Sequence, residues 1–299
     1  MKLFMLPQQK RPLISLMTVA VSLAHSALQA QTVHFDALAG KGGKESTSSC
    51  VSLDAKGSLS TIVELGADMK KATLVVDGKK VPLTYVVNDI NSRLVIYKLP
   101  EDSKGMAGEA AAMGDSLSLT PSQALYTSAS KRDDVVKVVG RVNRFQGKTL
   151  PLAVIRLNHS KSAPPQGSGV YDEKGKLVGM VRQSVFGETS SSYCLPVEVI
   201  TRTLKDLEKN GKVRRCWIGI VMDELVAPPI VESVRPGSPA RKAGLQKGDV
   251  ILSVGDQKVS DYYEVVDAFF YLIAGEAKTF KVLRGTEVKE ISVSPEVSP

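Results

Sequence analysis

A loop that contains glycine and serine, residues 163–169, carries one candidate side chain for nucleophilic chemistry. Ser168 lies there between two glycines. A serine attacks a peptide carbonyl efficiently when a base lies beside it, a carboxylate orients the base, and backbone N–H groups hold the oxyanion. After the first thirty residues the chain has two histidines, His34 and His159, and His159 is the one close to Ser168 in sequence. Ser168 with His159 as base is therefore one candidate for hydrolysis.

The sequence after this loop resembles the nucleophile hairpin of trypsin-like proteases. There a Gly-Asn-Ser-Gly-Gly loop precedes a strand, an Asn/Asp-x-x-Gly turn and a Val-x-Gly strand. When the turn is aligned on Gly175 and the second strand on Val178-Gly179, Gln166 stands at the position of the serine. Ser168 falls two positions too late and would face away from the cleft. One oxyanion donor would come from Pro164, which has no N–H.

The C-terminal third carries the most specific pattern in the chain, Gly-Ser-Pro-Ala-Arg-Lys-Ala-Gly-Leu-Gln-Lys-Gly-Asp-Val-Ile at residues 237–251. It resembles a bacterial PDZ domain, in which a short Ala-x-x-Ala-Gly helix leads through a Gly-Asp turn into a Val-Ile strand. Asp261–Ala274 then corresponds to the longer PDZ helix, and residues 279–283 and 288–293 to the closing strands. The resemblance covers nearly all of residues 213–294.

A trypsin-like double barrel, a linker helix and a PDZ domain, in this order, resemble the HtrA/Deg family of envelope proteases and chaperones. The resemblance implies that Glu64 stands at the position of the triad histidine and Arg93 at that of the aspartate. With Gln166 at the serine position, all three triad members are changed, and no combination of the three does nucleophilic acyl transfer. The chain is identified as a catalytically degenerate member, a pseudoprotease. We expect Glu64, Arg93 and Gln166 to form a structural ion pair with a hydrogen bond.

We predict a mostly β chain, with a degenerate trypsin-like double β-barrel at residues 49–211 and a C-terminal α+β PDZ domain at residues 212–299. Short strand-like runs separated by turn signals predict the barrels, and an amphipathic helix that begins at Pro196 follows them. Residues 31–48 are polar and glycine-rich, which predicts a flexible lead-in. Residues 1–30 have a basic start, a short apolar run and then small residues, as in a secretory signal peptide.

Composition narrows the classes of partner and the location. The formal net charge of +8 falls to +5 without the basic residues of the signal peptide, which are Lys2, Lys10 and Arg11. The chain has no run of five like charges and only 5% aromatic residues, whereas nucleic-acid binding needs clustered basic residues. The apolar run near the N-terminus is too short to span a membrane comfortably. We expect an exported protein, periplasmic or secreted, with no nucleic-acid partner and no stable membrane span.

Three cysteines, Cys50, Cys194 and Cys216, are too few and too widely spaced for a disulfide framework. Each lies in an apolar, strand-like context, which favours small buried side chains. A bridge between Cys194 and Cys216 is the alternative. No Cys-x-x-Cys occurs and histidines are scarce, so we expect no metal site and no cofactor.

The PDZ resemblance implies a groove that adds an extended C-terminal peptide to a sheet edge and holds its carboxylate with backbone amides. The loop that binds the carboxylate would be Trp217-Ile218-Gly219-Ile220, and the facing helix would contribute Tyr262 and Val266. These apolar walls predict peptides or protein C-termini with hydrophobic ends, bound with micromolar affinity. Such binding fits a role in envelope protein quality control.

Two alternatives from other classes stay open at this point. One is an active serine endopeptidase with the displaced pair Ser168 and His159. The other is a structural subunit, in which the groove residues only seal the PDZ core against the barrels. A homo-oligomer is also compatible with the sequence, although the family trimerises through aromatic residues near the mature N-terminus and Phe35 is the single candidate here.

Overall fold

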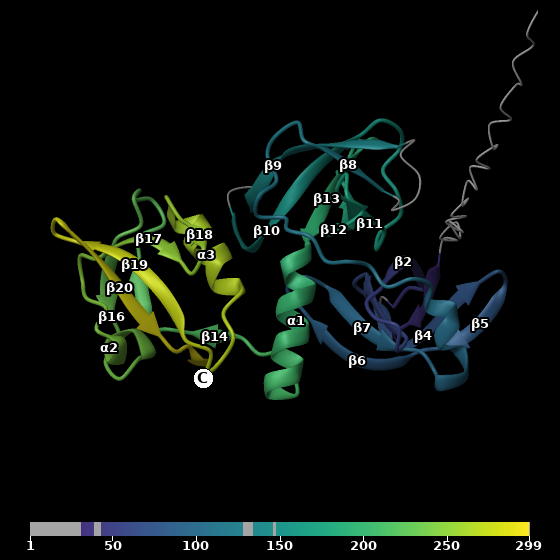
Figure 1. Cartoon of the computed structure of the whole chain (residues 1–299), viewed down its shortest axis with the longest axis horizontal. Helices are drawn as coiled ribbons and strands as arrows, with labels where there is room; N and C mark the ends of the chain where they lie inside the picture. The colour runs from purple at the N-terminus through teal and green to yellow at the C-terminus, as the bar shows by residue number, and fades with distance from the viewer. Residues whose placement is uncertain (1–30, 39–42, 128–133, 146–147, 299) are drawn as a thin grey trace, which may run out of the picture.

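The computed structural model describes residues 31–38, 43–127, 134–145 and 148–298. Two β modules and a PDZ module are arranged around a central helix, α1 (Val197–Asn210) (Figure 1). The mostly β fold class is confirmed. The predicted signal peptide at residues 1–30 lies outside the described residues.

The first module is a curved antiparallel sheet of seven strands in the order β5-β4-β1-β2-β3-β7-β6. The strand pairing leaves it open, so it is not a closed barrel. Alternate apolar side chains fill its core, including Leu59, Leu74 and Tyr97. The strands are β1 (Thr32–Ala37), β2 (Ser46–Ser52), β3 (Ser58–Ile62), β4 (Ala67–Val76), β5 (Lys79–Pro82), β6 (Thr84–Asp89) and β7 (Leu94–Lys98).

The predicted flexible lead-in at residues 31–48 is wrong over β1 and the start of β2. Strand β1 pairs with both β2 and β4, because Val33 and Phe35 alternate with polar residues and point into the core. The Phe35 side chain is 2% exposed, and its ring centroid lies 6.2 Å from that of Tyr97. Phe35 therefore packs within its own module and offers no aromatic surface to a second copy.

The second module is a closed six-stranded barrel in the order β10-β13-β12-β11-β8-β9. The short helix η1 (Glu101–Ala107) precedes it. Residues 116–118 before β8 form a turn, in which the Ser116 N–H and hydroxyl both donate to the Glu198 carboxylate. The barrel strands are β8 (Ala124–Tyr126), β9 (Val135–Phe145), β10 (Lys148–His159), β11 (Gly169–Tyr171), β12 (Leu177–Ser184) and β13 (Ser191–Pro196).

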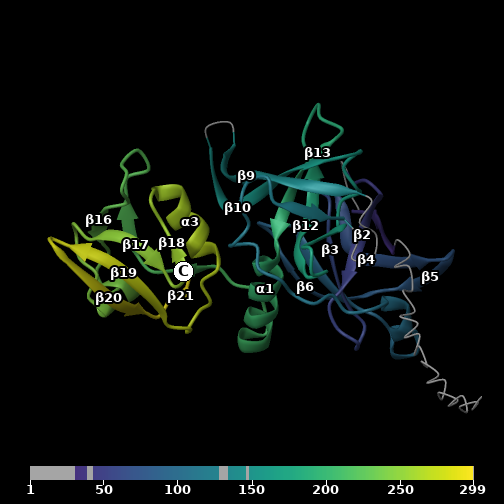
Figure 2. The same cartoon turned by 45° about the horizontal axis from the view of Figure 1, so that its top comes forward.

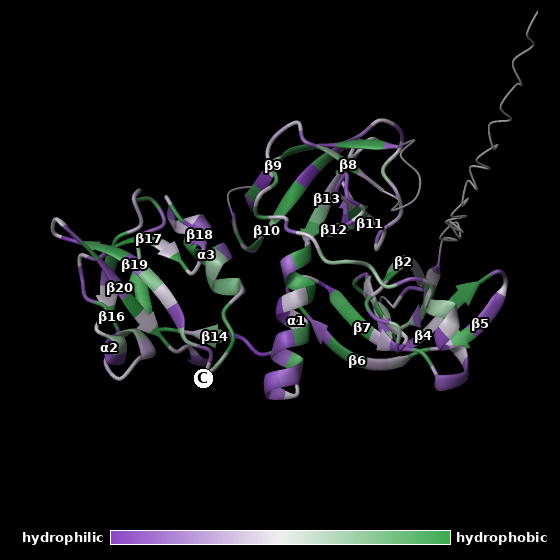
Figure 3. Ribbon diagram, viewed as in Figure 1, coloured by the Kyte–Doolittle hydropathy of each residue, from purple (hydrophilic) through white to green (hydrophobic). Residues whose placement is uncertain are grey.

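Helix α1 follows Pro196 and ends where Gly211, in the left-handed conformation at φ 68°, donates its N–H to the Leu207 carbonyl. Its apolar face is buried against both β modules, as the green and purple faces of the helix in Figure 3 indicate. One hydrophobic cluster is shared by the first sheet, the barrel and α1: Val51, Ile62, Leu94, Leu152, Tyr171, Leu177, Met180, Leu195, Val197, Val199 and Ile200. Phe270 and Tyr271 of the PDZ module pack against the same cluster.

The PDZ module has its own core around Leu245, Ile251, Val265 and Phe280. Its longer helix, α3, is four residues shorter at its C-terminal end than predicted, and Asp261 caps it by accepting a hydrogen bond from the Glu264 N–H. The elements are β14 (Cys216–Trp217), β15 (Ile220–Met222), β16 (Val231–Val234), α2 (Pro239–Ala243), β17 (Val250–Val254), β18 (Gln257–Lys258), α3 (Tyr262–Phe270), β19 (Lys278–Arg284), β20 (Glu287–Val293) and β21 (Glu296–Val297).

All three cysteines are free thiols, so the alternative bridge between Cys194 and Cys216 is not formed. Burial raises the pKa of Cys50 to about 12 and raises that of Cys194 further. Thiols that stay protonated are poor nucleophiles and poor metal ligands. In the part of the chain that the structure describes, no helix is both long and apolar enough to cross a membrane.

Helix α3 of the PDZ module lies beside β10 of the barrel (Figure 2), and the buried carboxylate of Asp267 bonds the two. A register shift in the pairing of β10 with β9 ends at Val154, and the N–H of Ala153 donates to Asp267 Oδ1 at 2.8 Å. Gln257 Nε2 donates to the other oxygen, Asp267 Oδ2, at 3.0 Å. Burial raises the pKa of Asp267, and the hydrogen bond from Ala153 partly offsets this.

Replacing Asp267 by alanine is expected to weaken the attachment of α3 to the barrel by about 1–3 kcal/mol of free energy, because the buried N–H of Ala153 loses its acceptor. Hydrogen exchange should become faster at the Ala153 amide, and α3 should lose protection. Asp256→Ala is the matched control, since Asp256 forms no ion pair among the described residues. Equal exchange rates at Ala153 in both variants would contradict this role of Asp267.

Candidate functional site

The residues predicted at the triad positions meet at the boundary between the two β modules. Glu64 follows β3, Arg93 precedes β7, and Gln166 lies in the loop before β11. Strands β3 and β7 pair, and the Val63 N–H donates to the Arg93 carbonyl at 3.0 Å. The amide Nε2 of Gln166 donates to the Ile62 carbonyl at 3.0 Å, which brings the third residue to the same place.

The loop around Gln166 is fixed by its backbone. The Gln166 carbonyl accepts hydrogen bonds from the Ser49 N–H at 2.7 Å and from Ser48 Oγ at 3.0 Å. Gly167 adopts φ +83°, and a β-carbon there would overlap the Ser49 carbonyl oxygen. The loop is thus held against the first module, with the Gln166 side chain turned onto β3.

The expected ion pair between Glu64 and Arg93 is not formed. The Glu64 side chain is exposed, and its charge only partly offsets the burial that lowers the pKa of Arg93. Arg93 Nη2 instead reaches across to the barrel and donates to Gln183 Oε1 at 2.9 Å. The side-chain amide of Gln166 donates to the backbone of β3 and not to Glu64 or Arg93.

A second arginine makes a similar contact in the opposite direction. Strand β12 has a register shift between Val181 and Gln183, and Arg182 at this bulge donates from Nη2 to the Asn91 carbonyl at 3.4 Å. Burial and the nearby charge of Arg93 lower the pKa of Arg182 to about 10. Arg93 and Arg182 therefore join the two modules at the boundary where the triad positions meet.

The displaced pair Ser168 and His159 is not brought together. His159 is the last residue of β10 and is buried, so it does not lie in a surface loop. Its Nε2 hydrogen-bonds with Ser192 Oγ at 2.7 Å inside the barrel, and burial lowers its pKa. Because Ser192 is fully buried, this serine–histidine pair lies out of reach of a polypeptide substrate.

The PDZ groove is built around the loop between β14 and β15. Gly219 adopts φ +81°, and its carbonyl accepts the Arg235 N–H at 2.8 Å. A β-carbon on Gly219 would overlap the side chain of Ser238, which is fully buried and caps α2. Only glycine therefore fits this position of the loop.

A cavity of about 320 Å³ lies at this loop. The predicted residues Trp217, Ile218, Gly219 and Ile220 line it, together with four residues that sequence reasoning did not identify: Cys216, Arg235, Phe269 and Ser298. The predicted helix residues Tyr262 and Val266 are half-buried on α3 but do not line this cavity.

The helical spacing of residues in α3 could have identified Phe269 from the sequence. It lies seven residues after Tyr262 and three after Val266, on the same face of α3 and one turn closer to the loop. Ser298 reaches the cavity because β21 pairs with β14 and the Ser298 N–H donates to the Arg215 carbonyl at 2.9 Å. That contact has no signal in the sequence.

Strand β15 offers one free edge beside this cavity. It pairs antiparallel with β16 in a two-stranded sheet, with Ile220 opposite Val234, and no described strand occupies its other side. A strand with one unpaired edge can accept the backbone of an extended peptide. The open edge, the tight glycine loop and the cavity therefore lie together on one side of the PDZ module.

Comparisons with known proteins agree with this arrangement. The PDZ domain family matches residues 216–294. A protein from Marinomonas sp. (strain MWYL1), named a probable periplasmic DegP-like serine endoprotease, is 26% identical over 253 residues, which cover 78% of this chain and 53% of that protein. A protein of the same name from Pseudomonas putida (strain GB-1) is 27% identical over 169 residues, or 50% of this chain and 35% of that protein. The chain thus spans about half the length, or less, of these curated relatives.

Solved structures share the fold over almost the whole chain. The HtrA-type protease AlgW with a bound tripeptide superposes with a TM-score of 0.62 at 19% identity, covering 91% of this chain and 95% of that one. The serine endoprotease from Yersinia pestis gives a TM-score of 0.52 at 19% identity, covering 91% and 96%. The succession of two β modules, a helix and a PDZ module is therefore common to these proteins.

Proposed function

We propose that this protein, a member of the HtrA/Deg family, binds the C-terminal ends of other polypeptides through its PDZ groove and does not cleave them. The observation that carries the proposal is the open edge of β15 next to the Gly219 loop and its apolar cavity. Trp217, Ile218, Ile220 and Phe269 would surround a hydrophobic terminal side chain. The loop amides would hold the terminal carboxylate, and AlgW, a structural neighbour, was solved with peptides bound.

The absence of cleavage is proposed from the residues at the triad positions. Glu64, Arg93 and Gln166 replace base, orienting carboxylate and nucleophile, and Pro164 removes one oxyanion donor. Hydrogen bonds from the side chains of Arg93 and Arg182 link the two β modules at the place where the triad positions meet. Losing one oxyanion donor by itself lowers the rate of peptide hydrolysis by about a hundredfold or more.

We place this activity in the periplasm or outside the cell, as part of envelope protein quality control. The signal-like pattern of residues 1–30 supports export, and the curated relatives are named as periplasmic proteins. The partners would be peptides or protein C-termini with hydrophobic ends. Neither a nucleic acid nor a metal is needed for this function.

A second candidate function is proteolysis, which the name of the relatives, serine endoprotease, favours. The purified full chain is expected to leave unfolded casein intact over hours, and Gln166→Ser is expected to remain inactive, because triad residues act as a unit. An active HtrA-type protease in the same assay is the positive control. Turnover by the wild-type chain that is lost in Ser168→Ala would overturn the proposal in favour of the displaced pair.

Peptide binding separates the proposal from a purely structural role. Fluorescence anisotropy with short peptides that end in a hydrophobic residue is expected to give micromolar dissociation constants for the free acid. The C-terminal amide of the same peptide should bind at least about tenfold more weakly, because it lacks the charged acceptor for the loop amides. Equal binding of acid and amide, or binding of neither, would refute the groove as a receptor for chain ends.

A further inference from the structure

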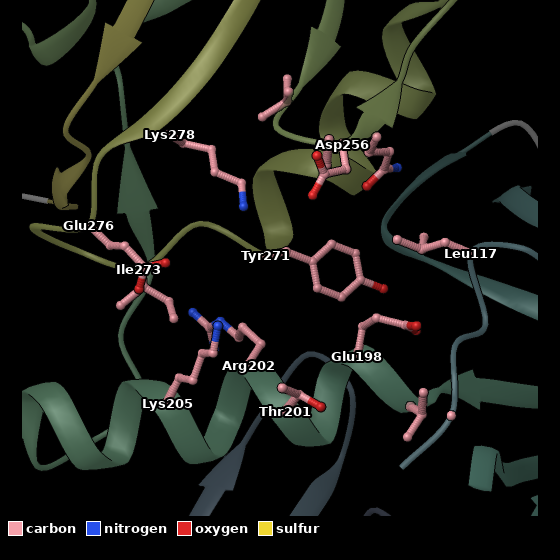
Figure 4. Close-up of a pocket in the computed structure, with 15 residues that line it drawn as sticks. Leu117, Glu198, Thr201, Arg202, Lys205, Asp256, Tyr271, Ile273, Glu276 and Lys278 are labelled. Carbon is pink, nitrogen blue, oxygen red and sulfur yellow. The ribbon is translucent and has the colours of Figure 1, made fainter. Parts of the chain in front are cut away.

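A second cavity, of about 320 Å³, lies between α1 and the PDZ module (Figure 4). It shares no lining residue with the peptide groove, and its walls come from both sides of the junction. Arg202 and Lys205 extend into it from α1, and Tyr271 and Lys278 extend into it from the PDZ module. A ligand in this cavity would therefore contact α1 and the PDZ module at the same time.

Three cationic side chains converge at one end of this cavity. Figure 4 shows the nitrogen ends of Arg202, Lys205 and Lys278 directed toward the same space. Within the described ranges, Lys205 and Lys278 form neither an ion pair nor a side-chain hydrogen bond. Lys205 is exposed and Lys278 half-buried, so both ammonium groups are available.

Arg202 forms the buried part of this cationic end. Its side chain is 6% exposed, and Nη2 donates to the Arg214 carbonyl at 2.6 Å and lies 3.5 Å from Asp206 Oδ2. The Nε–H of Arg202 is buried and has no acceptor among the described residues. This N–H group is a donor that no described side chain or carbonyl uses, as are the Nε–H groups of Arg93, Arg156, Arg182 and Arg214.

The acidic residues of the cavity do not neutralise these cations. Glu198 already accepts both hydrogen bonds of Ser116, and Asp256 lies at the other end of the cavity in Figure 4. Glu276 is on the cationic side but, in the described part of the chain, forms an ion pair with none of the three. Because Arg202 is already paired with Asp206, two lysines face one nearby carboxylate, that of Glu276, which leaves one positive charge in excess at this end.

The rest of the cavity has both polar and apolar walls. The ring of Tyr271 projects across its middle, and Val197, Val254, Ala268 and Ile273 lie around it. The Tyr271 hydroxyl is buried, and the Arg141 side chain lies close enough to interact with it. An occupant with an apolar body would contact the ring of Tyr271 and the apolar walls.

We propose that this cavity binds a small organic oxyanion, an apolar body that carries one phosphate or carboxylate group. The oxyanion would accept hydrogen bonds from Lys205, Lys278 and Arg202, and the apolar body would lie against the Tyr271 ring. Because its contacts come from α1 and from the PDZ module, the ligand would stabilise the junction between them. This site goes beyond the proposed function and does not depend on peptide binding.

Isothermal titration calorimetry of the full chain tests the site with four probes: phenyl phosphate, benzoate, inorganic phosphate and benzyl alcohol. Phenyl phosphate or benzoate is expected to bind with a dissociation constant of about 0.1–1 mM, the range for ligands of this size. Inorganic phosphate should bind more weakly and benzyl alcohol not measurably. Tighter binding of phenyl phosphate would identify the head group as phosphate, and tighter binding of benzoate would identify it as carboxylate.

Three variants assign the binding to the proposed residues. Lys205→Met and Lys278→Met are each expected to weaken the better probe about tenfold, since each removes a charged hydrogen-bond donor. Lys212→Met, an exposed lysine just beyond α1 that does not line the cavity, should bind as the wild type does. Thermal unfolding of each unliganded variant checks that it is folded.

The proposal is overturned if neither phenyl phosphate nor benzoate binds. It is also overturned if Lys205→Met and Lys278→Met bind like Lys212→Met, or if inorganic phosphate or benzyl alcohol binds as tightly as the better probe. Peptide anisotropy measured on the same samples keeps this result separate from a failure of the PDZ groove.

Discussion

Gly179→Ala is expected to lower the free energy of unfolding of the β modules by about 3 kcal/mol, and Gly179→Asp to prevent folding altogether. Gly179 lies in β12, opposite Val170 on one side and Pro196 on the other. A β-carbon there would lie 2.5 Å from Cys194 Sγ and 2.5 Å from the Leu195 carbonyl oxygen. Because strands hold both neighbours, the backbone cannot move away, and aspartate would also bury a charge without a partner.

Urea unfolding monitored by circular dichroism measures this effect. Gly140→Ala is the matched control, since Gly140 is also in a barrel strand and a β-carbon added to it would have no neighbour within 4 Å. The control should unfold at the wild-type urea concentration or slightly above it. A Gly179→Ala variant as stable as the control would show that β12 and β13 are packed less closely than described.

The second large effect concerns the peptide groove, where Gly219→Ala is expected to weaken peptide binding at least about tenfold. Alanine is strained at φ +81°, and its β-carbon would meet the Ser238 side chain. Either the loop or the start of α2 must then move, and the loop amides would no longer converge on the peptide carboxylate. Anisotropy with a hydrophobic free-acid peptide measures the loss.

Gly237→Ala serves as the control for this experiment. Gly237 also has a positive φ, +71°, but nothing lies within 4 Å of the place that a β-carbon would take. The substitution should cost stability of about 1 kcal/mol while peptide affinity stays close to the wild-type value. If both variants lose affinity equally, the effect comes from general destabilisation and not from the geometry of the loop.

Much of the architecture follows from short-range patterns. The Ala-x-x-Ala-Gly helix, the Gly-Asp turn and the following strand recur in the structure as α2, its turn and β17. Helix α1 begins after Pro196 and ends at Gly211, as the residues at its two ends predict. Each of these elements is specified by residues that are neighbours in the sequence.

Elements that depend on distant partners are harder to predict. Strand β1 is not evident from the sequence although Val33 and Phe35 alternate with polar residues, because the polar and glycine-rich composition of the segment outweighs so short an alternation. The short strands β8 and β21 are defined by the strands that they pair with. His159 is buried because β10 continues to its last residue and places it opposite Val136 on β9 and against Ser192 of β13.

The candidate site shows the same division. Alignment of a turn and a strand puts Gln166 at the position of the serine, and the structure brings Gln166, Glu64 and Arg93 to the same boundary. The partners of the Arg93 side chain are not predictable, because they depend on the bulge at Arg182, which turns two successive side chains of β12 toward the first module. Local pattern thus locates the residues, while the tertiary structure sets their contacts.

The hydrophobic cluster shared by both β modules and α1 has a mechanical consequence. Phe270 and Tyr271 of the PDZ module pack on that cluster, and Asp267 is bonded to the barrel. A load on the peptide groove is therefore transmitted to the β modules and not absorbed by a flexible hinge. Under the proposed function, the two β modules would anchor the PDZ module and keep a bound chain end in one orientation.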